Sequence, residues 1–241
     1  MSDPLTYPVP FRLLARELSG PILRKERADA GRIYRAIVAR MNPPPLFEGL
    51  DNLPETPRFI LAANHYERSG LWIAHIASAL ACAMSARYGA IPPIRWIVTA
   101  NWPRWRVGPF AVRSPGDILL PRVAHAVWCY AVPFAGTNPT RSAQSLRRLV
   151  KDAGSLSSPV GIFPEGAGAK AGTPGPPLPG ISRLLSLMAA KNWGVLPVGV
   201  SEAGRFVMRF GCLMPAHEIV ESRDPAEEVM VRVRALAAGS Q

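Results

Sequence analysis

Short apolar runs alternate along the chain with stretches of helical periodicity. Six of these runs, each bounded by turn residues, are typical of buried strands: residues 58–63, 94–98, 131–134, 159–163, 195–200 and 205–213. Helical spacing of apolar residues fills three of the intervals, at about 70–87, from 140 onward and at about 181–191. Strands that alternate with helices pack as layers, so the sequence predicts an α/β fold with a central, mostly parallel sheet flanked by helices.

The last helix is the most clearly marked element. Asp224 suits the N-cap, Pro225 the first helical position and Glu227 the third, and Gly239 follows the final turn. Residues 100–117, in contrast, are rich in Trp, Arg, Pro and Gly, and we expect them to be irregular.

The first 45 residues form an N-terminal helical segment. Three prolines at 43–45 end the helix. Before them, apolar residues recur at helical spacing: Ile33, Tyr34, Ile37, Val38 and Met41. Between Ile22 and Met41 stand six basic and two acidic residues. Such a helix can lie on an anionic membrane surface, or it can pack its apolar stripe on the domain and expose its basic face.

The composition narrows the class of protein. Of 241 residues, 48% are hydrophobic and 19% are charged, which excludes a disordered, collagen-like or heptad-repeat chain. Lys+Arg number 28 against 17 Asp+Glu, a net charge of +11 that implies an anionic partner. Nucleic acid, a membrane surface and an acidic carrier protein all fit that charge.

The sequence gives no indication of a metal site, a disulfide or a membrane-spanning segment. The three cysteines are far apart and lack zinc-ligand spacing, so we expect reduced thiols and no bound metal. The longest apolar stretch, Leu71 to Met84, is too short to span a bilayer, and no apolar leader opens the chain. We therefore expect a cytoplasmic protein that is soluble or peripheral.

Two predicted strands each end in residues capable of chemistry. Asn64 and His65 follow the first strand, and Glu165 and Gly166 follow another. Histidine is the side chain best suited to take up a proton at neutral pH, and a glycine-rich turn can offer backbone N–H groups to an anion. Each feature alone is also an ordinary strand end, so it is their combination that indicates a site.

These residues resemble the motifs of the glycerophosphate/lysophosphatidate acyltransferase superfamily. The matching blocks occur in family order and span roughly residues 45–215: Asn64-His65, Phe163-Pro164-Glu165-Gly166 and Leu196-Pro197-Val198. The resemblance implies that residues 46–241 form an acyltransferase-like α/β domain. It also implies transfer of a fatty acyl group from acyl-CoA or acyl carrier protein to a hydroxyl of a lipid-like acceptor, with no bound cofactor.

By the same resemblance, His65 is the general base and the Phe-Pro-Glu-Gly block lies on the acceptor side. The substrate-binding residues that it implies are Asn64, Phe163, Pro164, Glu165, Gly166 and Lys170. The family's first motif is Asn-His-x4-Asp, so its Asp falls at position 70, where this chain has Gly70. The family's second-motif Arg falls at Gly136, and Lys170 is the nearest cation to the position of the third-motif Arg.

Glu67 is the nearest carboxylate that could replace the missing Asp and act with His65. Two positions along a helix correspond to about 200° of rotation, so Glu67 faces away from His65 if the helix has already begun. If the segment is an extended loop, Glu67 can reach the imidazole. A distant carboxylate or a backbone carbonyl could also orient the ring.

Two other functions compete with acyl transfer. A degenerate member could bind lipid or acyl thioester without turnover, as Gly70 and Gly136 suggest. Nucleic-acid binding is the other, because Trp96, Trp102 and Trp105 stand among arginines and aromatics can stack on bases. No nucleic-acid-binding motif accompanies them, so we expect no nucleic-acid partner and assign the charge to the anionic inner face of a membrane or to an acyl carrier.

Overall fold

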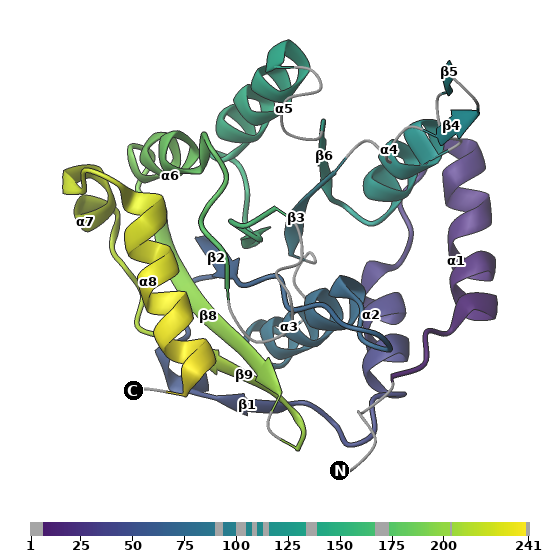
Figure 1. Ribbon diagram of the computed structural model, residues 1–241, viewed down its shortest axis with the longest axis horizontal. Coiled ribbons are helices and arrows are strands. Elements are labelled where there is room, and N and C mark those ends of the chain that lie inside the picture. Colours follow the sequence, from purple (N-terminus) through teal and green to yellow (C-terminus); the bar gives the residue numbers. More distant parts are fainter. Residues whose placement is uncertain are drawn as a thin grey trace.

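The computed structural model describes residues 7–89, 94–99, 105–107, 110–112, 116–133, 139–166, 174–202 and 204–239. Its main sheet has seven strands in the order β1-β9-β8-β2-β7-β3-β6 (Figure 1). These are β1 Leu46–Glu48, β9 Phe206–Phe210, β8 Gly194–Glu202, β2 Phe59–Ala63, β7 Val160–Ile162, β3 Arg95–Thr99 and β6 Tyr130–Val132. All neighbours are parallel except β8 and β9. The predicted α/β class is confirmed.

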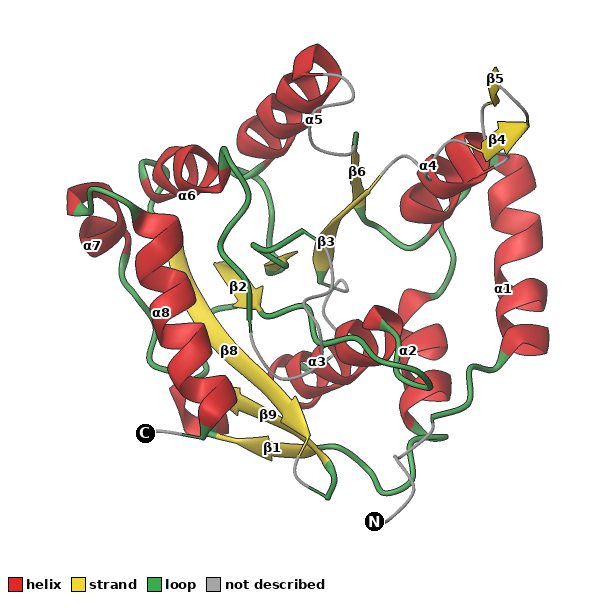
Figure 2. Cartoon of the chain, viewed as in Figure 1, coloured by secondary structure: helices red, strands yellow, loops and turns green. Residues whose placement is uncertain are grey.

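The helices of the described residues cover both faces of this sheet. They are α1 Phe11–Arg24, α2 Ala30–Val38, α3 Ile73–Tyr88, α4 Gly116–Ala126, α5 Pro139–Asp152, α6 Ile181–Ala189, α7 Ala216–Glu221 and α8 Pro225–Ala238. In Figure 1, α6 and α8 lie on one side of β8, and α2 and α3 lie on the other. A short antiparallel ribbon, β4 Trp105–Val107 with β5 Phe110–Val112, stands apart from the main sheet (Figure 2).

The pleat of β2 divides the interior into two cores. Phe59, Leu61 and Ala63 belong to the core that includes α2 and α3. Ile60 and Ala62 belong to the core that includes α6 and α8. Because successive side chains point to opposite faces of a strand, an entirely apolar strand must be buried on both sides. The result is a three-layer sandwich with β2 at its centre.

The N-terminal helical segment shares the core of the domain. The α2 helix packs its apolar stripe on the domain, so of the two arrangements this one holds. Ile33, Tyr34 and Ile37 are buried in the core, as is Met41 just after the helix, and Val38 is partly buried against it. Before them, Tyr7 is buried and donates its backbone N–H to the carbonyl of Gly70 at 3.0 Å. The α1 helix, in contrast, contains no buried residue.

Several boundaries differ from the prediction. The basic stretch from Ile22 to Met41 is divided between two helices, with Asp29 capping the second. Residues 100–117, expected to be irregular, include the ribbon β4–β5 and the start of α4. Strand β1 and helix α7 were not predicted, because elements of three and six residues are too short to show a period. The capping of α8 by Asp224 and Gly239 is as predicted.

No helix in the described part of the chain is both long enough and apolar enough to cross a membrane.

Candidate active site

The two motif-bearing strands end at the same edge of the sheet. In the register of the parallel strands, Ala62 of β2 lies opposite Ile162 of β7 and Pro197 of β8. The chain therefore leaves β2 at Asn64 and β7 at Phe163 side by side. In open α/β sheets this carboxyl edge is where ligands bind.

Asn64 fastens the start of the loop to β8. Its side-chain amide donates to the carbonyl of Val200 at 2.9 Å, and its Oδ1 accepts the backbone N–H of Val200 at 2.6 Å. The residue is buried, and this exchange satisfies both polar ends of its side chain. Asn64 thus holds the adjacent His65 at the sheet edge through the backbone.

Glu165 holds His65 from the other side. One carboxylate oxygen accepts the backbone N–H of His65 at 2.8 Å, and the other accepts the backbone N–H of Gly175 at 2.6 Å. Only 6% of the residue is exposed. The carboxylate therefore joins the loop after β2 to the segment that begins at residue 174.

The rest of the Phe-Pro-Glu-Gly block is packed against the same segment. The carbonyl of Pro164 accepts the backbone N–H of Leu178 at 2.8 Å. Gly166 has a φ of +70°, which favours glycine, and a Cβ at this position would collide with the side chain of Leu178. The block thus forms a tight turn beside His65.

An aromatic pair forms the wall next to the imidazole. Phe163 stacks on Trp96 with ring centroids 4.8 Å apart and 7° between the planes. His65 meets the same Phe163 ring edge-on, at 5.5 Å between centroids. Gly161 lies opposite Trp96 in the β3–β7 register, and a Cβ there would overlap the indole ring. Glycine in β7 is what leaves room for this wall.

Glu67 lies beside His65 in the non-helical loop between β2 and α3. The Nδ1 atom of His65 is 3.7 Å from a carboxylate oxygen of Glu67. This distance is too long for a hydrogen bond, and the contact becomes an ion pair only when the imidazole is protonated. The His65 side chain is 13% exposed and that of Glu67 is 47% exposed, so the carboxylate faces both the ring and solvent.

Burial lowers the pKa of His65 below its ordinary value of 6.5, and the Glu67 and Glu165 carboxylates offset part of that effect. The imidazole is therefore neutral near pH 7. A neutral imidazole with a carboxylate near Nδ1 can take up a proton at Nε2.

Gly70 occupies the position of the family's motif Asp, and the structure places it in a tight turn. Arg68 and Leu71 exchange backbone hydrogen bonds across it, from Leu71 N–H to Arg68 at 3.0 Å and from Arg68 N–H to Leu71 at 3.3 Å. The φ of Gly70 is +77°. The predicted helix at 70–87 therefore begins three residues later, at Ile73.

Three residues of the loop region were not singled out from the sequence. Arg68 and Tyr66 both contact Glu202 at the end of β8, with Arg68 Nε 2.6 Å and Tyr66 Oη 3.3 Å from the same carboxylate oxygen. Arg68 Nη2 bonds the other oxygen of Glu202. The sequence does show opposite charges after β2 and at the end of β8, at Arg68 and Glu202. It does not show that these two strands are neighbours, so the ion pair could not be predicted from it.

Some predicted residues are not part of this geometry. Lys170, Gly136 and Trp102 lie outside the described residues. Trp96 is buried in the core, so its ring is not open to stack on a nucleic-acid base. Among the described residues, no group of three or more His, Cys, Asp and Glu could hold a metal ion.

Comparisons with known proteins bear on the fold. No protein-family model matches the chain, and no curated protein matches it. Among solved structures, the 1-acyl-sn-glycerophosphate (LPA) acyltransferase PlsC from Thermotoga maritima matches with a TM-score of 0.60. The chain has the fold of that acyltransferase. The match covers 95% of this chain and 92% of PlsC, at 14% sequence identity. At this identity the likeness is one of fold, and it agrees with the acyltransferase resemblance of the motifs.

Proposed function

We propose that this protein transfers a fatty acyl group from an acyl-CoA or acyl-carrier-protein thioester to a hydroxyl of a lipid-like acceptor. One observation carries the proposal. His65 lies at the carboxyl edge of an acyltransferase-like sheet, with its backbone held by Glu165 and its Nδ1 atom 3.7 Å from Glu67. A neutral, oriented imidazole at a ligand-binding edge is what general-base chemistry requires.

The reaction follows from the two nitrogens of the ring. Nε2 of His65 takes the proton of the acceptor hydroxyl as its oxygen attacks the thioester carbonyl. The C–S bond then breaks, and the thiolate leaves with the proton that the imidazole held. Glu67 stabilises the transient imidazolium through Nδ1, the part played by the family's Asp.

We propose that the acceptor is not a simple glycerol phosphate. Gly136 and Gly70 replace the Arg and Asp of the family motifs, and Lys170 is the nearest cation to the third-motif Arg position. Without those arginines, a phosphate dianion would lack the paired donors that bind it best. We therefore expect a lipid-like alcohol without that phosphate.

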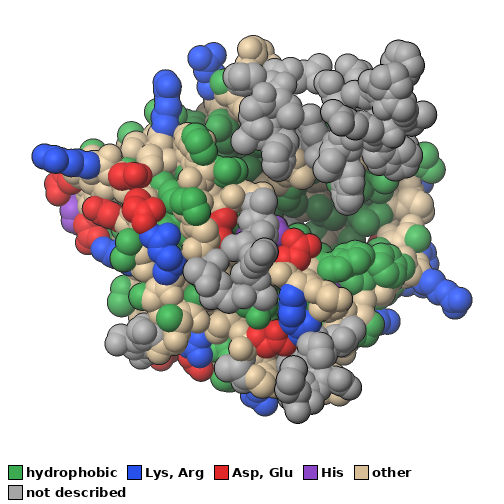
Figure 3. Space-filling view, in the orientation of Figure 1, with side chains coloured by type: hydrophobic (Ala, Val, Ile, Leu, Met, Phe, Trp, Pro, Cys, Tyr) green, Lys and Arg blue, Asp and Glu red, His purple; other side chains and the backbone are tan. Residues whose placement is uncertain are grey.

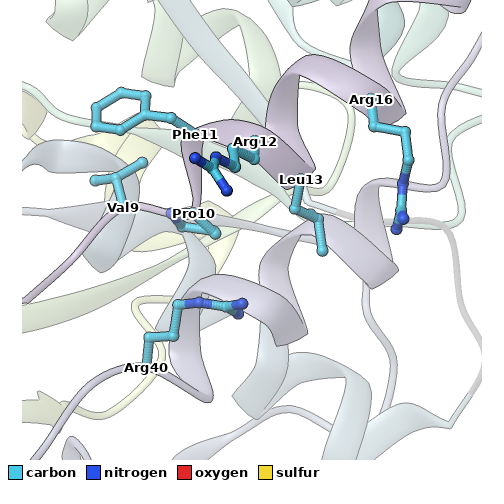
Figure 4. A pocket seen from close by; sticks show the side chains of 7 residues that line it. All are labelled: Val9, Pro10, Phe11, Arg12, Leu13, Arg16 and Arg40. Carbon is cyan, nitrogen blue, oxygen red and sulfur yellow. The ribbon is translucent and has the colours of Figure 1, made fainter.

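We also propose that the protein binds an anionic membrane surface, and that α1 is the element that contacts it. Arg12, Arg16 and Arg40 surround an open hollow of about 630 Å³ between the start of α1 and the turn after α2 (Figure 4). Phe11 and Leu23 of α1 are 61% and 76% exposed. Apolar side chains also gather on the right of the face in Figure 3, with basic side chains at its edge. Exposed apolar groups beside arginines suit the interface of an anionic bilayer.

Thiol release with acyl-CoA and with acyl carrier protein as donors tests the proposed reaction. His65→Ala should reduce the rate by about 10²- to 10⁴-fold, the usual contribution of a general base. His217→Ala is the matched control, because His217 is exposed on α7, and it should keep full activity. Protein without donor provides the background, since Cys212 is exposed and reacts with thiol reagents. Full activity in His65→Ala would refute the mechanism.

Binding without turnover is the second candidate. Both oxygens of Glu165 are occupied by backbone N–H groups, so in this structure the side chain acts as a structural clamp. If acyl-CoA binds with saturation and neither donor releases thiol for any alcohol tested, the protein is a binder. Turnover with either donor excludes that candidate.

A further inference from the structure

Glu202 is the point at which the loop after β2 is anchored beyond His65. Its carboxylate accepts Arg68 Nε at 2.6 Å and Tyr66 Oη at 3.3 Å, and it also bonds Arg68 Nη2. The Arg68 and Glu202 side chains are 14% and 15% exposed. A bidentate, largely buried pair of this kind has a defined geometry, unlike most surface ion pairs.

The residues bound to Glu202 stand two positions apart in the loop after β2. Tyr66 and Arg68 point to β8, as does Asn64 two residues earlier. The loop turns at His65, where the Tyr66 N–H donates to the carbonyl of Asn64 at 3.1 Å. His65 and Glu67 alternate with the two residues that bind Glu202, and the His65 Nδ1 atom lies 3.7 Å from the Glu67 carboxylate.

We propose that Glu202 is a positioning residue of the catalytic loop: by binding Tyr66 and Arg68 on one side, it fixes His65 and Glu67 together on the other. This inference rests on the proposed function for its catalytic meaning, although the geometry can be tested without any reaction. The turn at Gly70 also helps to hold Arg68 in place, because the backbones of Arg68 and Leu71 are hydrogen-bonded to each other across it. Glu202 itself acts through these neighbours.

Kinetics give the first test. Glu67→Gln and Glu202→Ala should each lower kcat about fivefold, with KM for the donor within about twofold, and the double variant should be no slower than either. Independent roles would instead multiply the two losses, and that result would overturn the proposal.

A matched control comes from the other side of the sheet. Glu48 of β1 binds Arg209 of β9 through the same carboxylate-to-Nε contact, at 2.6 Å. Arg209 also binds Ser201 of β8, but among the described residues no hydrogen bond or ion pair joins Glu48 or Arg209 to residues 64–71. Glu48→Ala should lose stability comparably while kcat stays unchanged. An equal loss of kcat in Glu48→Ala would show that Glu202 has only a general structural effect.

The second test reads the geometry directly and needs no substrate. The chain has four histidines, so the titration of His65 can be followed by NMR and assigned with His65→Ala. Two carboxylates act on the pKa of His65, those of Glu67 and Glu165, and Glu165 stays in every variant. In the wild type, Glu67→Gln should lower the pKa of His65, because it removes a carboxylate that favours the imidazolium.

In the Glu202→Ala background, the same Glu67→Gln change should lose most of its effect on His65, since Glu67 would no longer be held beside the ring. An unchanged effect in that background overturns the proposal. If Glu202→Ala does not fold, Tyr66→Phe and Glu202→Gln remove single bonds and should show the same loss of coupling to a smaller extent. Because this reading does not depend on turnover, an inactive wild type would refute the proposed function and leave the positioning role testable.

Discussion

The carboxylate of Glu165 accepts the backbone N–H of His65 at 2.8 Å, across 100 residues of sequence. The motif glutamate thus acts on the motif histidine through the main chain. The position of the imidazole therefore depends on how the ends of β2 and β7 are spaced. The Phe-Pro-Glu-Gly motif therefore has a structural role as well as the substrate-binding role that the resemblance implies.

Replacing Glu165 with Gln should destabilise the fold. The amide keeps one oxygen as an acceptor but turns an NH₂ group toward the second backbone N–H, at His65 or at Gly175. A buried unpaired donor costs about 1–3 kcal/mol, so the free energy of unfolding in urea should fall by that amount. Glu228→Gln, at an exposed position of α8, should change it by less than about 0.5 kcal/mol. Equal stability of the two variants would contradict the clamp.

Glu67→Gln should slow turnover and move its pH dependence in a defined direction. A half-exposed carboxylate about 4 Å from a cation stabilises that cation by about 1 kcal/mol in water-like surroundings, so its removal should lower kcat roughly fivefold. The carboxylate raises the pKa of His65, so its removal lowers that pKa. The acid limb of kcat/KM should therefore shift to lower pH. A shift to higher pH would mean that Glu67 does not face the ring.

Acid should destabilise the protein through its buried histidines. Burial lowers the pKa of both His65 and His75 below 6.5, so the unfolded chain binds more protons once the pH falls below that value. Stability should be lost progressively as pH decreases below about 6.5. His75→Asn keeps an acceptor for the Trp72 N–H that His75 Nδ1 now accepts at 3.0 Å, and it should reduce the loss measured by urea unfolding between about pH 7.5 and about pH 5.5. His217→Asn should leave the loss unchanged.

Restoring the family's acid at position 70 should not restore a family-type active site. Gly70 has a φ of +77°, and a side chain there costs about 1 kcal/mol of backbone strain. Gly70→Asp and Gly70→Asn should therefore lose similar stability in thermal unfolding, and neither should increase thiol release. A gain in activity for Gly70→Asp alone would show that the loop can rearrange to bring an acid to His65.

The wall beside His65 depends on the absence of a side chain at position 161. Gly161→Ala puts a methyl group into the ring of Trp96, and overpacking of this kind costs about 1–3 kcal/mol. Because Trp96 supports Phe163, turnover should fall as well. Gly154→Ala is the control, since a Cβ there has nothing within 4 Å. An unchanged Gly161→Ala protein would mean that the stack relaxes without effect.

The sequence was informative wherever a residue's role could be read from its neighbours along the chain. The uninterrupted apolar run at 58–63 predicted a buried central strand, and Asp224, Pro225 and Gly239 predicted the limits of α8, because capping is local chemistry. The strand ends at His65 and Glu165 were likewise visible. Their proximity followed from parallel pairing, which the alternation of strands and helices indicated.

The rest depended on contacts that no local pattern encodes. Whether Glu67 faces His65 turns on the backbone of the loop, and that backbone is set by Glu202, which is 134 residues away from Arg68. The burial of Trp96 depends on a glycine in another strand, so the sequence alone could not show that this aromatic residue among arginines lies in the core. Charge and composition could not distinguish these cases.

The anchoring of Asn64 by Val200 and of Arg68 by Glu202 also governs the order of assembly. His65 and Glu67 are synthesised more than 130 residues before the part of β8 that anchors their loop. Contacts of such sequence separation form late and slowly. Tyr7 must wait longer still, since its ring packs against Phe206, 6.4 Å away between centroids. A nascent chain therefore carries His65 and Glu67 before the contacts that position them can form.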